Sequence, residues 1–279
     1  MRTPDEMLKL ILAVAKKDER IRAVLLSGSR ANPDCPVDRY QDFDIVYFVK
    51  DTAPFWDNMA WIEENFGKPC LLQKPESMKL VPPDNDGNYV YLMLFPDGNR
   101  IDLTVTNEKY ENHGEPAVVL LDKDGVIPKI ETDPTYWWVK KPTQKLFSDC
   151  ANEFHWCFNN VAKGIARDEI PYSMVMFGYV RDMLVQMISW YIGSEHDFKI
   201  SVGKCGKYFK NYLCKELYER FLSTYPEANA EKMWQASFEM VSLFGEVARS
   251  VAGKLGFRYD EDEEKGILDY ITFVRSQNL

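Results

Sequence analysis

The chain has 279 residues, of which 46% are hydrophobic and 14% aromatic, and this globular composition excludes wholesale disorder. Its 34 basic and 43 acidic side chains give a net charge of -9, which argues against a nucleic-acid partner because a phosphate backbone favours a basic surface. No apolar run reaches the ~18 residues of a membrane span and the N-terminus lacks a signal-peptide pattern, so we expect a cytoplasmic chain without a membrane partner.

The cysteines and histidines give no sign of a zinc site. The six cysteines are scattered without a C-x-x-C pair, and the three histidines lie far apart in the sequence. We therefore interpret the cysteines as reduced, structural thiols.

The first half of the chain mixes helix and strand patterns. Helical spacing of apolar residues predicts helices over 4–17 and 53–66. A Pro-Asp-Gly-Asn segment at 96–99 predicts an antiparallel hairpin between the strands that flank it. Apolar, β-branched and aromatic runs predict strands over 21–27, 42–49, 88–95, 100–106 and 117–121.

Beyond residue 143 strand signals almost vanish and long amphipathic segments follow. They predict helices over 143–166, 171–192, 204–223, 229–254 and 265–276. The acidic run 260–264 is interpreted as a solvated connection, with attraction of a substrate as the alternative. We predict an α+β fold with an N-terminal domain over 1–138 and an all-helical domain over 139–279.

Three aspartates and a Gly-Ser pair carry the functional signal. Gly28 and Ser29 end one predicted strand, Asp42 and Asp44 lie on the next, and Asp102 lies in a later one. Alternate residues of a strand share a face, so the carboxylates of Asp42 and Asp44 point the same way, roughly 6–7 Å apart. If the strand of Asp102 lies beside theirs, three carboxylates converge.

Converging carboxylates repel one another unless cations neutralise them, which indicates Mg²⁺ held by oxygen ligands. The Gly28-Ser29 pair offers close backbone approach, a hydroxyl and free amides for phosphate oxygens. Together these groups suit in-line nucleotidyl transfer by two metal ions. Each feature alone has an ordinary structural explanation, such as a turn or an exposed strand edge; the interpretation depends on their conjunction.

These residues also resemble a known family. Gly28-Ser29, Asp42-Phe43-Asp44 and Asp102 look like the signature of polymerase-β-like nucleotidyltransferases. Over nearly the whole chain the sequence is similar to aminoglycoside 6-adenylyltransferases, the streptomycin-modifying group. The matching segments are 26–32 (Leu-Ser-Gly-Ser-Arg-Ala-Asn), 41–46 (Gln-Asp-Phe-Asp-Ile-Val), 159–165 (Asn-Asn-Val-Ala-Lys-Gly-Ile) and 167–172 (Arg-Asp-Glu-Ile-Pro-Tyr).

The resemblance implies an antibiotic-resistance enzyme that transfers AMP from its co-substrate ATP to a streptomycin hydroxyl, expected at the 6-position, and releases pyrophosphate. It implies a polymerase-β-like catalytic domain over 1–138 and a helical substrate-binding domain over 139–279. It further implies that Asp42, Asp44 and Asp102 are the catalytic metal ligands. Gly28, Ser29 and Arg30, within the first matching segment, are then expected to bind the nucleotide.

Three residues of the second half are weaker candidates. Lys163 and Lys204 are candidates for contacts with the triphosphate, although Lys163 equally suits a helix C-terminus. Lys204, Lys207 and Lys210 follow at three-residue spacing around an expected helix start, where cations oppose the helix dipole unless phosphate is bound. Asp182, beside an apolar stripe, is a candidate base with a pKa raised by partial burial, or else the partner of a basic residue.

Further side chains leave alternatives open. His155 is interpreted as a packed helix residue. Large aromatics are core residues by default, although they could also stack on adenine or line the drug pocket. These aromatics are Trp137, Trp138 and Trp156. Three acidic residues are alternative candidates for binding the guanidinium or ammonium groups of the drug: Glu153, Asp168 and Glu169.

A cationic aminoglycoside suits the acidic chain, and we expect a monomer. The alternatives are another acceptor (a different aminoglycoside, a lincosamide or a protein) or a nucleotide-binding regulator without turnover.

Overall fold

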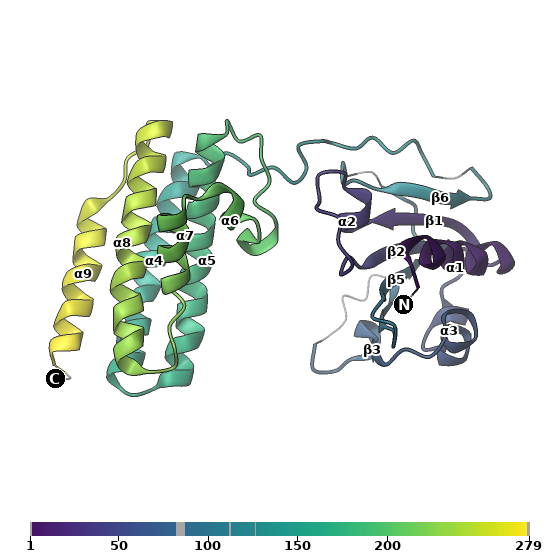
Figure 1. Ribbon diagram of the computed structural model, residues 1–279, viewed down its shortest axis with the longest axis horizontal. Helices are drawn as coiled ribbons and strands as arrows, with labels where there is room; N and C mark the ends of the chain where they lie inside the picture. The colour runs from purple at the N-terminus through teal and green to yellow at the C-terminus, as the bar shows by residue number, and fades with distance from the viewer. Residues whose placement is uncertain (1, 82–86, 112, 126, 278–279) are drawn as a thin grey trace. The chain divides into compact units, whose positions relative to one another are not determined.

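The computed structural model describes all residues of the chain except 1, 82–86, 112, 126 and 278–279 (Figure 1). The chain divides into two compact units, Met1–Tyr136 and Trp137–Leu279. The first unit contains a mixed sheet with helices, and the described residues of the second contain helices and no strand. The predicted α+β fold class is therefore confirmed.

The first unit is built on a six-stranded sheet with the order β3-β4-β5-β2-β1-β6. Neighbouring strands pair antiparallel except β2 and β5, which are parallel. The predicted strands are confirmed to within one or two residues, but β3 was not predicted, because three residues with two of them exposed carry no periodic signal. The strands are β1 (Ile21–Ser27), β2 (Phe43–Val49), β3 (Leu71–Gln73), β4 (Tyr89–Leu94), β5 (Arg100–Thr106) and β6 (Val118–Asp122).

Helices α1 (Pro4–Lys17) and α3 (Met59–Phe66) pack with one face of this sheet in a single hydrophobic cluster. The helix α1 begins where predicted, and Thr3 and Glu6 form a capping box at its start. The hydroxyl of Tyr47 on β2 donates to the carbonyl of Ile11 in α1 at 2.7 Å. The helix predicted over 53–66 is instead a 3-10 turn (Ala53–Phe55) followed by α3, because Asp57 between them has φ +50°.

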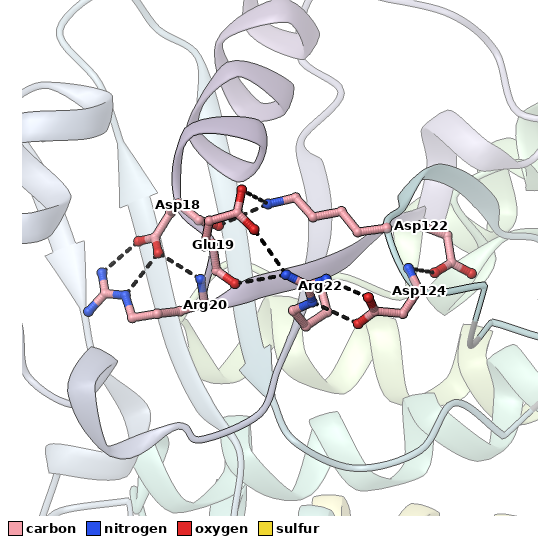
Figure 2. Close-up of polar contacts among 7 residues, drawn as sticks. Asp18, Glu19, Arg20, Arg22, Asp122 and Asp124 are labelled. Atoms are coloured by element: carbon pink, nitrogen blue, oxygen red, sulfur yellow. Dashed lines mark hydrogen bonds and ion pairs between the residues drawn. The ribbon is translucent and has the colours of Figure 1, made fainter.

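A network of ion pairs joins the start of β1 to the end of β6 (Figure 2). Arg22 donates from Nε to Asp124 at 2.7 Å and also pairs with Glu19 at 3.1 Å. Arg20 pairs with Asp18 at 2.6 Å just before β1. Such partly exposed pairs each contribute about 0–1 kcal/mol to stability. We therefore interpret this network as a modest structural contact at the edge of the sheet.

The second unit is a helical bundle of α4 (Gln144–Ala166), α5 (Ile170–Glu195), α8 (Ala230–Leu255) and α9 (Glu261–Ser276), with shorter pieces between α5 and α8. Phe154 of α4 stacks on Phe244 of α8 with ring centroids 3.8 Å apart, at the centre of a large buried cluster. These four helices agree with the predicted ones except at their ends. None of the described helices is long and apolar enough to cross a membrane.

The helix predicted over 204–223 is wrong. The segment 204–223 is not one helix but a 3-10 turn (Lys204–Gly206), α6 (Phe209–Tyr212) and α7 (Lys215–Ser223). Gly203, Cys205 and Gly206 have φ values of +68°, +56° and +73°, which an α-helix does not accept. The expected helix start at Lys204 is therefore absent.

The acidic run at 260–264 is a helix start rather than a solvated connection. The carboxylate of Asp260 accepts from the amides of Asp262 and Glu263 at 3.1 and 3.2 Å, which caps α9. Carboxylates in a first helical turn are favoured by the helix dipole. Glu264, the last residue of the run, is buried and pairs with Arg249.

Candidate active site

The sheet register brings the three aspartates together. Asp44 of β2 pairs directly with Asp102 of β5, and Phe43 pairs with Ile101. Asp42 immediately precedes β2, so it lies beside the first residue of β5, Arg100. Alternation buries Phe43 and Ile101 and leaves the aspartates half-buried or at the edge of the same face, so the predicted neighbourhood of the two strands is confirmed.

The Gly-Ser turn presses against this cluster from β1. Ser27 pairs with Asp44, and the short helix α2 (Gly28–Ala31) begins at the next residue. Gly28 has φ +65°, and a Cβ built on it would lie 2.0 Å from Oδ2 of Asp44. Glycine is therefore required here for both conformation and space, because it lets the backbone meet the Asp44 carboxylate directly.

Arg30 links the Gly-Ser turn to the segment that carries Asp42 through hydrogen bonds. Its guanidinium donates to the carbonyl oxygens of Gln41 and Asp42 at 2.7 and 2.9 Å and lies 3.9 Å from the ring centroid of Phe43. The side chain of Gln41 donates back to the carbonyl of Ser29 at 3.2 Å. The structure thus gives Arg30 a positioning contact, and its predicted contact with the nucleotide stays a prediction.

Arg100 is the cation of the cluster, and sequence reasoning missed it. Its guanidinium forms two hydrogen bonds with Asp102, from Nε at 2.7 Å and from Nη2 at 2.6 Å, and Nη1 lies 3.4 Å from Oδ2 of Asp42. A signal existed in the sequence, because a residue two positions before Asp102 on a strand shares its face.

The charges of the site perturb one another. Burial first, and then the neighbouring Asp102 and Asp42, raise the pKa of Asp44 to about 6. Burial also raises the pKa of Asp42, while Arg100 opposes that rise. A cation bound here would relieve the repulsion of Asp44 by its like-charged neighbours.

The donor chemistry of the cluster fits Mg²⁺, which prefers carboxylate oxygens. The guanidinium of Arg100 shows that Asp102 and Asp42 accept a cation from the same side. As the side chains stand, no three His, Cys, Asp or Glu residues among those described are grouped closely enough to hold a metal ion. In this structure the guanidinium of Arg100 donates to both oxygens of Asp102.

A pocket of about 760 Å³ continues from the aspartates along the same face of the sheet. It is lined by Ser27 and Val46, the neighbours of Asp44, and by Glu108 and Glu115 of the segment after β5. The charge of Glu115 is the smallest contribution to the raised pKa of Asp44, after burial, Asp102 and Asp42. This wall, which also includes Lys109 and His113, was not predicted, although three glutamates fall between 108 and 115.

The candidates of the helical unit do not form one cluster. Lys163 lies half-buried in the last turn of α4, and Asp182 is exposed on α5, so the partial burial invoked for a base is not found. Lys204 is exposed and borders a pocket of about 770 Å³ together with Trp137 and Glu153. The roles of Lys163, Asp182 and Lys204 stay predictions.

His155 is a packed side chain of the helical core. Its ring nitrogens lie 3.4 Å from Glu263 Oε2 and 3.4 Å from the hydroxyl of Tyr259. Burial lowers the pKa of His155, and the carboxylate of Glu263 opposes that shift. The interpretation of His155 as a packed helix residue agrees with this environment.

Comparisons with known proteins agree on one family. A family model described as streptomycin adenylyltransferase matches residues 1–274. The aminoglycoside 6-adenylyltransferase of Bacillus subtilis (strain 168) is 39% identical over 277 residues, 97% of each chain, and that of Campylobacter jejuni is 41% identical over 278 residues, 97% of this chain and 95% of its own. A crystal structure of an aminoglycoside 6-adenyltransferase from Bacillus subtilis has 36% identity over 99% of both chains, with a TM-score of 0.48.

Proposed function

Because the chain belongs to the streptomycin adenylyltransferase family, we propose that it transfers AMP from ATP to the 6-hydroxyl of streptomycin and releases pyrophosphate. Family membership makes it a nucleotidyltransferase that modifies an aminoglycoside. The choice of streptomycin, the 6-position and the use of Mg²⁺ are what the proposal adds. We further propose that it acts in the cytoplasm as a monomer, on a small cationic drug rather than a nucleic acid.

The observation that carries the proposal is the pairing of Asp44 with Asp102 beside the Gly28 turn. Asp42, Asp44 and Asp102 would hold Mg²⁺, which supplies charge neutralisation and polarisation at the α-phosphate when bound. Gly28 would let the backbone approach the phosphates of ATP closely, and Ser29 would offer its hydroxyl to a phosphate oxygen. Arg30 keeps these two halves of the site in register through its contacts with Gln41 and Asp42.

The helical unit, Trp137–Leu279, supplies the remaining roles in this proposal. Lys163 and Lys204 are proposed to contact the triphosphate, and Asp182 to accept the proton of the acceptor hydroxyl. The assignment of Asp182 rests on its carboxylate alone, since it is exposed in this structure.

A cationic acceptor suits the charges near the aspartates. Glu108, Glu111 and Glu115 line the pocket that adjoins Asp44. Streptomycin carries two guanidinium groups, and a guanidinium binds a carboxylate through paired, charge-assisted hydrogen bonds. This supports an acceptor subsite on the open face of the sheet.

Mass spectrometry of streptomycin incubated with the enzyme, ATP and Mg²⁺ tests the proposal. We expect one added AMP, located at the 6-position, and no product with the Asp44→Asn variant. Parallel reactions with other aminoglycosides and a lincosamide identify a different acceptor if streptomycin is unchanged. Retained ATP binding without any product would instead favour the nucleotide-binding regulator.

A further inference from the structure

The guanidinium of Arg100 occupies two of the three carboxylates at once. Arg100 is the first residue of β5 and lies two residues before Asp102, so both side chains project from the same face. Its Nε and Nη2 lie 2.7 and 2.6 Å from the two oxygens of Asp102, and its Nη1 lies 3.4 Å from Asp42. Both oxygens of Asp102 are therefore already engaged by one cation.

This arrangement opposes the binding of a metal ion to Asp102. Mg²⁺ binds carboxylate oxygens at about 2.0–2.1 Å, which would place two positive charges side by side on the same carboxylate.

The side chain of Arg100 is able to leave. It is 44% exposed, and its guanidinium is attached through a flexible stem. Arg100 also borders a second pocket of about 590 Å³, lined by Leu71, Leu92 and Leu94 of β3 and β4. That pocket has room for the displaced side chain on the side of the strand away from β2.

We propose that Arg100 is a built-in counter-cation of the aspartate cluster, which a divalent metal ion must displace from Asp102 before it binds. The inference rests on the proposed function, since it concerns the metal ligands assigned there. Arg100 stabilises the metal-free cluster and at the same time weakens its affinity for metal. Arg100 therefore raises the concentration of divalent metal at which the site becomes occupied.

Binding of Mn²⁺ alone, without ATP or streptomycin, tests this role. Mn²⁺ accepts the same oxygen ligands as Mg²⁺, and the electron paramagnetic resonance signal of the free ion reports the bound fraction. We expect Arg100→Gln to bind Mn²⁺ roughly tenfold more tightly than the wild type, because an opposing charge near 4 Å is removed. Arg100→Lys, which keeps the charge but loses the planar fork, should fall between them.

Two further variants serve as controls. Arg22→Gln removes a comparable arginine–aspartate pair on the same sheet, with Asp124, away from the aspartate cluster, so it should leave the Mn²⁺ affinity unchanged (Figure 2). Asp44→Asn gives the level of binding that does not depend on the Asp44 carboxylate.

The outcomes separate this inference from the proposed function. If the wild type binds Mn²⁺ more tightly than Asp44→Asn but neither Arg100 variant gains affinity, the counter-cation role is overturned while the metal site stands. If the wild type and both Arg100 variants bind no better than Asp44→Asn, the assignment of the metal ligands falls and the counter-cation role falls with it, while the transfer of AMP to streptomycin is tested separately by mass spectrometry. A gain confined to the Arg100 variants supports displacement.

Discussion

Replacing Gly28 with alanine tests whether this glycine sets the position of Asp44. The added Cβ would lie 2.0 Å from Oδ2 of Asp44 and 2.7 Å from its Cγ. Real Cβ contacts are essentially never shorter than 3.0 Å, so the carboxylate or the turn must move by at least the difference, 1.0 Å. In addition, φ +65° is left-handed backbone, which costs an alanine about 1–2 kcal/mol.

The two effects have different consequences. A displacement of about 1 Å in a catalytic group is expected to lower turnover by about 100-fold. The backbone strain is expected to lower the free energy of unfolding by about 1–2 kcal/mol. Pyrophosphate release with ATP, Mg²⁺ and streptomycin measures the first, and urea unfolding of the same preparation measures the second.

Gly125→Ala is the matched control for backbone strain. Gly125 has φ +64°, nearly that of Gly28, but a Cβ on it would meet no atom within 4 Å. It should lose the part of the stability that backbone strain accounts for and keep its turnover. Near-wild-type turnover of Gly28→Ala would refute the reasoning, as would an equal loss of turnover in Gly125→Ala.

Four other variants have defined outcomes. The raised pKa of Asp44, about 6 against an ordinary 3.8, means that its ionisation costs stability as the pH rises through this window. Asp44→Asn should therefore raise the free energy of unfolding of the metal-free protein by about 1–2 kcal/mol above pH 7, after solvent screening, and by about half of that at pH 5, measured by urea unfolding. Arg30→Gln should lower kcat by about tenfold with little change in the KM for ATP, because the loss is in positioning; a raised KM with unchanged kcat would indicate a direct phosphate contact instead. Gly245→Ala should cost about 1–3 kcal/mol of stability, because its Cβ would lie 2.3 Å from Glu264 Oε1 between α8 and α9. Gly253→Ala in the same helix meets no atom within 4 Å and should instead gain about 0.5–1 kcal/mol, with thermal unfolding as the measurement for both.

Much of the secondary structure followed from local patterns. The strands β1 and β5 and the helix α1 have the predicted bounds, because apolar periodicity and a capping residue act within a few residues of each other. The helix predicted over 204–223 is wrong because that prediction, too, used only local patterns. Its apolar spacing suits a helix, but Cys205 adopts φ +56°, a left-handed conformation that a cysteine in the sequence does not signal.

The sequence alone determined that Asp42 and Asp44 share a face, that Asp102 stands apart from its apolar neighbours, and that a Gly-Ser pair ends the preceding strand. Strand alternation is a property of the backbone and needs no partner. Only the tertiary structure decided that β2 and β5 pair in parallel with Asp44 opposite Asp102, that Gly28 touches the Asp44 carboxylate, and that Arg100 neutralises the cluster. The pairing register of two strands depends on how distant segments bury their apolar faces together, and that is a property of the whole fold.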